Sequence, residues 1–100
     1  MSEPPAQVKS DTLSRALEII NQRGLHARAS ARFVQTVSSF RADIQVEKGG
    51  VTVGGGSIMG LMMLAAGPGC SIRVTASGPD AKAALDALES LVASRFGEEA

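Results

Sequence analysis

Apolar and polar residues alternate, or run apolar, in four stretches of the chain that each predict a β-strand. A strand that alternates in this way buries one face and leaves the other in water. Two adjacent glycines, Gly49 and Gly50, separate the middle pair of stretches and predict a tight hairpin turn. The four predicted strands cover residues 13–20, 42–47, 51–53 and 70–76.

Three further stretches repeat their apolar residues at the spacing of one helical face. The first covers residues 27–40 and has an apolar face that ends at Phe40. The second begins after Ser57, a good helix cap, and is stopped by the Gly-Pro-Gly of residues 67–69. The third opens after residues 77–80 and carries one stripe of Ala, Leu and Val as far as Val92.

The predicted order is strand, helix, strand, strand, helix, strand, helix. Half-buried strands with helices between them favour an α+β fold, an open-faced β-sandwich in which a four-stranded antiparallel sheet carries three helices on one face. We expect one domain over residues 13–97, because 100 residues suit a single core. Residues 1–12 lack apolar periodicity and are expected to form a flexible leader, and residues 98–100 a short tail.

Composition removes several classes of function. Ten basic and ten acidic residues cancel, and three Phe with no Tyr or Trp leave little for base stacking, so nucleic acid is not an expected partner. The single Cys70 cannot form an internal disulfide, which favours a reducing, cytoplasmic setting. The N-terminus does not resemble a signal peptide, and no apolar run reaches the roughly 18 residues of a membrane span.

The lone histidine, His26, stands where the first strand gives way to the first helix. A helix start presents unpaired backbone N–H groups, here those of Ala27 and Arg28, and so favours an anion. Arg28 adds a planar cation that suits phosphate oxygens, and Gly24 allows a sharp turn before the ring. A neutral imidazole is also a nucleophile. From these residues alone, a phosphoryl acceptor and a solvated helix-capping histidine both remain open.

Residues 24–30, Gly-Leu-His-Ala-Arg-Ala-Ser, resemble the active-site motif of HPr, the histidine-containing phosphocarrier of the phosphoenolpyruvate-dependent phosphotransferase system. Residues 57–64, Ser-Ile-Met-Gly-Leu-Met-Met-Leu, resemble the family's regulatory-serine helix. The resemblance implies that enzyme I phosphorylates His26 on Nδ1, that Arg28 contacts the phosphoryl group, and that an EIIA-type protein receives it. Ala29 stands where many members have proline, which predicts an altered helix start rather than lost function.

The second motif allows two interpretations of Ser57, a plain helix cap or a serine that an HPr kinase/phosphorylase would phosphorylate. The helix that follows is more apolar than one face can bury. We expect Ile58, Leu61 and Met62 to pack in the core, and Met59 and Met63 to stay outside. The predicted docking residues for partner proteins are Ile58, Met59, Met62 and Met63.

Two competing functions need no histidine chemistry: a small-molecule-binding module of ACT-like order, and a pure interaction domain that uses the methionine-rich helix. One His and one Cys make no metal site, and residues 54–60 match neither a dinucleotide fingerprint nor a Walker loop, so no cofactor is expected. We expect a monomeric carrier rather than an enzyme. The methionine-rich helix and Ala29 favour the nitrogen-related branch over the sugar-transport branch.

Overall fold

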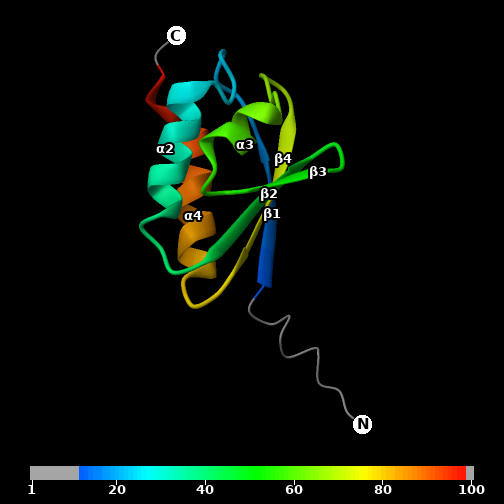
Figure 1. Cartoon of the computed structure of the whole chain (residues 1–100). Coiled ribbons are helices and arrows are strands. Elements are labelled where there is room, and N and C mark those ends of the chain that lie inside the picture. The colour runs from blue at the N-terminus through cyan, green and yellow to red at the C-terminus, as the bar shows by residue number, and fades with distance from the viewer. Residues whose placement is uncertain (1–11, 99–100) are drawn as a thin grey trace.

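Four strands form one antiparallel sheet in the computed structural model, which describes residues 12–98 (Figure 1). The strands lie in the spatial order β1-β4-β2-β3, and every neighbouring pair is antiparallel. The predicted fold class is therefore confirmed. The elements are β1 (Thr12–Glu18), α2 (Ala27–Val37), β2 (Asp43–Lys48), β3 (Val51–Gly54), α3 (Ile58–Met63), β4 (Ser71–Ser77), α4 (Ala81–Ala93) and the short turn η1 (Arg95–Gly97).

The register of the sheet places the apolar positions of its strands on one face. Ile44 pairs with Ala76 and Val46 with Val74 across β2 and β4, and all four side chains are buried. Because alternate residues of a strand point to opposite faces, the intervening Gln45 and Arg73 are exposed. This alternation produces one covered and one open face of the sheet.

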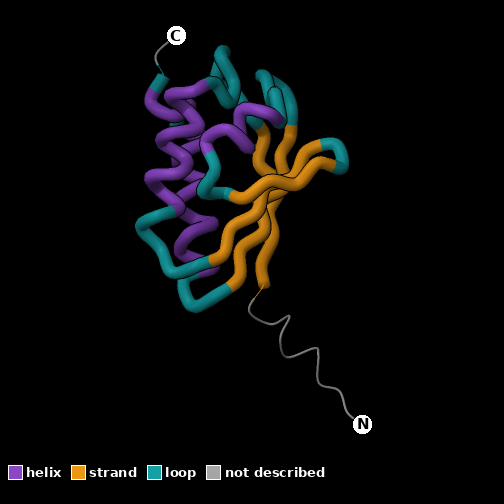
Figure 2. Tube along the Cα trace, viewed as in Figure 1, coloured by secondary structure: helices purple, strands orange, loops and turns teal. Residues whose placement is uncertain are grey.

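The helices lie together on the covered face, with α2 and α4 side by side and the shorter α3 next to α2 (Figure 2). Phe33 of α2 and Leu85 and Leu88 of α4 are fully buried between helices and sheet. Leu61 of α3 closes the same core. Each fully buried side chain of this size contributes about 1.5–3 kcal/mol relative to an exposed one, so this layer supplies much of the stability.

Ion pairs connect β1 to α4 at the edge of the core. Arg15 lies 2.7 Å from a carboxylate oxygen of both Asp86 and Glu89, and Lys82 lies 2.9 Å from Asp86 within α4. Hydrogen bonds from Lys82, and then from Arg15, hold the pKa of Asp86 below its ordinary value. These pairs are solvent-exposed, so each contributes little to the free energy of unfolding.

Several predicted boundaries differ from the structure. The first strand ends at Glu18, although Ile19 still donates its N–H to the carbonyl of Cys70 at 2.8 Å. The first helix ends at Val37, because the chain then turns through residues 38–40. The second helix ends at Met63, and Ala65 already adopts a left-handed backbone with φ 53°. The left-handed residue stops the helix before the glycines that were expected to do so.

The predicted leader, residues 1–12, falls outside the described residues except for Thr12, which pairs with Ser77 as the first residue of β1. Of the predicted tail, only Glu98 is described. Across residues 12–98 no helix has both the length and the apolar content needed to span a membrane.

Candidate functional site

His26 is the N-cap of α2, a position that Ser, Thr, Asp or Asn usually occupies. Its backbone is extended, with φ −74° and ψ −177°, and its ring nitrogen Nδ1 accepts a hydrogen bond from the N–H of Arg28 at 3.2 Å. Nδ1 therefore carries a lone pair and no hydrogen. That lone pair is directed at the start of the helix, where the dipole and the unpaired N–H groups favour negative charge.

The segment before the histidine is locked by backbone contacts. Asn21, fully buried, donates its side-chain amide to the carbonyl of Gly24 at 2.9 Å. Gly24 has φ 62°, and the next residue, Leu25, donates its N–H to Ala66 at 3.0 Å. Leu25 is buried, so its side chain anchors the turn in the core. The backbone at His26 is consequently held by the packed turn that precedes it and by α2, which follows it.

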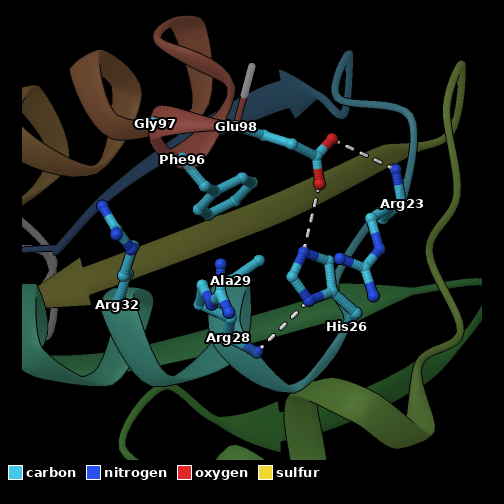
Figure 3. Close-up of a pocket in the computed structure, with 8 residues that line it drawn as sticks. All are labelled: Arg23, His26, Arg28, Ala29, Arg32, Phe96, Gly97 and Glu98. Atoms are coloured by element: carbon cyan, nitrogen blue, oxygen red, sulfur yellow. Dashed lines mark hydrogen bonds and ion pairs between the residues drawn. The ribbon is translucent and has the colours of Figure 1, made fainter. Parts of the chain in front are cut away.

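The other ring nitrogen, Nε2, lies 3.2 Å from Oε2 of Glu98, the residue that follows η1 (Figure 3). The second carboxylate oxygen of Glu98 accepts the backbone N–H of Arg23 at 3.3 Å. Burial alone would raise the pKa of Glu98, but hydrogen bonds from Arg23, Asn21 and His26 together lower it below its ordinary value. Glu98 is therefore ionised near neutral pH and acts as an acceptor for Nε2–H.

A small pocket beside the imidazole brings several cationic side chains together (Figure 3). Arg28 and Arg32 reach it from successive turns of α2. Among residues 12–98, Arg28 makes no ion pair, so its guanidinium is available to an anion. The described residues also include no group of three or more His, Cys, Asp or Glu side chains that could hold a metal ion. The pocket is lined by Arg23, His26, Arg28, Ala29, Arg32, Phe96, Gly97 and Glu98.

His26 and Arg28 lie within a stretch of the chain that matches a known family. The family model described as the PTS HPr component phosphorylation site covers residues 13–94. The chain belongs to the HPr family. It is thus a phosphocarrier of the phosphotransferase system, a carrier rather than a catalyst.

Relatives and solved structures agree with this assignment. The phosphocarrier protein HPr of Cupriavidus necator is 48% identical over 86% of this chain and 97% of its own length. The phosphocarrier protein NPr of Shewanella violacea is 41% identical over 86% of this chain and 94% of its own length. A crystal structure of HPr from Thermoanaerobacter tengcongensis superposes with a TM-score of 0.84 at 44% identity, covering 88% of this chain and 99% of that one.

The predicted residues of the phosphoryl site lie together. His26, Ala27 and Arg28 form the junction at the start of α2, as the sequence indicated. Ser57 is the N-cap of α3, and its hydroxyl accepts the N–H of Gly60 at 2.9 Å while the residue remains exposed. α3 packs against α2, so the two predicted sites lie on neighbouring helices.

The docking helix differs in part from its prediction. Met59 and Met63 are 71% and 73% exposed, and Leu61 is fully buried, as expected. The expectation that Ile58 and Met62 pack in the core was wrong, because each is 40% exposed. A helix of fewer than two turns at the margin of the core can bury only one narrow face. All four predicted docking residues are therefore accessible.

Glu98 and Arg32 line the pocket but were missed from the sequence. Glu98 was assigned to the tail, and its contact with His26 joins positions 72 residues apart, a separation that no local pattern encodes. Arg32 could have been found, because it lies one helical turn beyond Arg28 on the same side of the predicted helix.

Proposed function

We propose that His26 accepts a phosphoryl group on Nδ1 from phosphorylated enzyme I and donates it to an EIIA-type protein. The observation that supports this most strongly is the position of Nδ1 at the start of α2, with its lone pair free of hydrogen. A phosphorus atom attached there would be close to the backbone N–H groups of Ala27 and Arg28. We expect the carrier to act as a monomer, because it must present one face to successive partners.

The Arg28 guanidinium is proposed to contact the phosphoryl oxygens. Arg28 lines the pocket beside His26 and is exposed, so it can reach the group without being buried with it. One helix start and a few open arginines hold an anion loosely, unlike an enclosed cage of cations. Loose holding suits a carrier, whose partner must bring its own nucleophile in line with the phosphorus.

Partner docking is proposed to use the exposed apolar residues of α3, which we call the α3 patch: Ile58, Met59, Met62 and Met63. Methionine side chains are flexible and polarisable, so one surface of this kind can fit several partners. Because α3 packs beside α2, a protein seated on the patch would also cover the His26 pocket.

Ser57 is proposed as a regulatory phosphorylation site for an HPr kinase/phosphorylase. Its hydroxyl is exposed at the first residue before α3, next to the α3 patch. A phosphate there would add negative charge beside the docking surface without disturbing the core. We expect weaker binding to enzyme I as the result.

The test is incubation of the wild-type protein with enzyme I and labelled phosphoenolpyruvate, beside His26→Ala and Arg28→Ala. Acid-labile, alkali-stable label that is absent from His26→Ala supports the proposal. Arg28→Ala should accept label about tenfold more slowly or worse, as expected for one lost charge-assisted contact. Arg41→Ala is the matched control, because Arg41 is an exposed arginine that does not line the pocket.

Parallel reactions with sugar-type and nitrogen-type enzyme I identify the branch, and we expect faster labelling by the nitrogen type. A folded wild-type protein that takes up no label from either enzyme would contradict the proposal. That outcome would favour a ligand-binding module instead.

A further inference from the structure

The carboxylate of Glu98 contacts the imidazole of His26, from which it is 72 residues distant in sequence (Figure 3). Its side chain is only 15% exposed, and that of His26 is 21% exposed, so their contact is largely shielded from water. Each carboxylate oxygen has its own donor, Nε2 of His26 at 3.2 Å and the N–H of Arg23 at 3.3 Å. Two separate donors fix the orientation of the carboxylate as well as its position.

The three residues before Glu98 adopt an energetically unfavourable backbone conformation. Arg95, Phe96 and Gly97 have φ values of 60°, 54° and 75°, all in the left-handed region. For Arg95 and Phe96 this conformation costs about 1–2 kcal/mol each. The ring of Phe96 is 3% exposed, so its burial offsets part of that cost. Glu98 is therefore held in position by the turn of residues 95–97, which is anchored by the buried Phe96.

The hydrogen bonds of the imidazole specify where its hydrogen lies. A neutral imidazole has one N–H, on either Nδ1 or Nε2. Nδ1 accepts from Arg28, so the hydrogen is on Nε2, where it meets the carboxylate of Glu98. In the opposite tautomer the hydrogen would block Nδ1 and face the N–H of Arg28. The contact with Glu98 disfavours that tautomer.

We propose that Glu98 is a positioning residue for phosphoryl transfer: it keeps the hydrogen on Nε2, and it neutralises the positive ring that forms when Nδ1 is phosphorylated. The inference rests on the proposed function of His26. It adds a part that neither the helix start nor Arg28 can supply, because both of these favour the negative phosphoryl group and not the positive ring.

The transfer step balances without movement of a proton on the carrier. The lone pair of Nδ1 forms the bond to phosphorus, and the electrons of the donor's P–N bond return to the donor's nitrogen. The carrier ring keeps its hydrogen on Nε2 and becomes a positively charged, phosphorylated imidazolium. When the group leaves, the P–Nδ1 electrons return to Nδ1 and the neutral Nε2–H ring is restored.

The charges of the side chains around the ring favour a carboxylate beside Nε2. Arg28 and Arg32 line the pocket from α2, and Arg23 lines it from the preceding turn. Among the described residues that line the pocket, Glu98 is the single acidic one. Without it, a positive imidazolium would form among three guanidinium groups, which Coulomb repulsion disfavours.

The first experiment measures the tautomer in the unphosphorylated, ¹⁵N-labelled full chain by long-range ¹H–¹⁵N NMR. The wild type should show Nε2 protonated and Nδ1 unprotonated in its neutral ring. Glu98→Ala should raise the Nδ1–H population about threefold or more, which corresponds to one lost hydrogen bond. Glu98→Gln should retain the wild-type tautomer, because its amide oxygen can still accept Nε2–H.

The second experiment measures the equilibrium between enzyme I and the carrier, as the ratio of phosphorylated to free carrier. Glu98→Gln should lower this ratio about threefold to tenfold, because it keeps the tautomer but removes the negative charge. Glu98→Ala should lower it at least as far. Glu99→Ala removes the same charge one residue later and is the matched control, for which no change in either quantity is expected.

The outcomes separate this inference from the function on which it rests. Unchanged tautomer in Glu98→Ala together with an unchanged ratio in Glu98→Gln would overturn the role of Glu98 while phosphorylation of His26 stands. Equal losses in the Glu98 and Glu99 variants would also overturn it, since they would reflect only the net charge of the chain end. Failure of the wild type to accept a phosphoryl group would instead refute the proposed function.

Discussion

A methyl group added at Gly24 tests how firmly the turn before His26 is fixed. Gly24 has φ 62°, and a Cβ there would overlap the carbonyl oxygen of Ala66 and lie 2.9 Å from Cα of Gly67. Both obstacles are backbone atoms, which cannot rotate away as a side chain can. The segment that carries Ala66 must therefore move, and with it the acceptor of the Leu25 N–H.

The expected cost has two parts. The left-handed backbone disfavours alanine by about 1–2 kcal/mol. Forcing two backbone segments apart adds about 1–3 kcal/mol, by analogy with overpacked cores. Gly24→Ala should thus lower the free energy of unfolding by about 3 kcal/mol, which for a domain of this size lowers the thermal midpoint by about 12–24 °C.

Gly49→Ala is the matched control, because Gly49 has φ 59° but no atom within 4 Å of the added Cβ. It should cost about 1 kcal/mol, from backbone conformation alone. The free energy of unfolding of both variants is measured by urea denaturation, with circular dichroism as the signal. The folded Gly24→Ala variant should also accept the phosphoryl group at least about tenfold more slowly than the wild type, because its imidazole is displaced. Equal destabilisation of the two variants would refute the backbone overlap as the cause.

Three further predictions concern surfaces away from the turn. Ser57→Asp should slow phosphorylation by enzyme I about tenfold, yet leave the thermal midpoint within about 2 °C, because Asp is also a good N-cap; an unchanged rate would contradict the regulatory role. Replacing Met59 and Met63 together by Ser should weaken enzyme I binding, measured by calorimetry, about tenfold at constant stability. Val51→Ser, at an exposed apolar residue of the β3 edge, should change neither quantity, and unfolding of the double Met variant would show that the methionines belong to the core. Asp86 has a lowered pKa, so its ion pairs contribute stability above the unfolded pKa of about 4 that is lost as the pH falls through the folded pKa. The small difference in urea midpoint between the wild type and Asp86→Asn should accordingly disappear as the pH falls below about 4, and a constant difference would contradict the assignment.

Local rules made much of the fold predictable from the sequence. The alternation in β2 and β4 and the helical stripes are short-range patterns, and their periods already specify which residues face the core. The location of His26 and Arg28 at the start of α2 was predictable for the same reason, because Gly24, His26 and Arg28 are neighbours in sequence. Elements that end by a left-handed non-glycine residue were not predictable, as at Ala65, since no residue type marks that conformation.

The exposure of α3 depends on how much core is available and not on its own sequence. Ile58 and Met62 have the same spacing relative to Leu61 as core residues of a longer helix would have. In a helix of six residues that touches α2 and β3, only Leu61 is buried. Periodicity alone identifies an apolar face, whereas the fraction of that face that becomes buried depends on the neighbouring elements.

The geometry of the chain end links the integrity of the fold to the chemistry of the ring. Glu98 reaches His26 because Phe96 is buried, and Phe96 is buried because α4 ends at the same side of the sheet as the start of α2. A loss of packing at Phe96 would therefore release the carboxylate before the sheet is disturbed. The helix start can attract a phosphoryl group by itself, whereas among the described residues that line the pocket only Glu98, which is distant in sequence, offers a negative charge to the proposed positive ring.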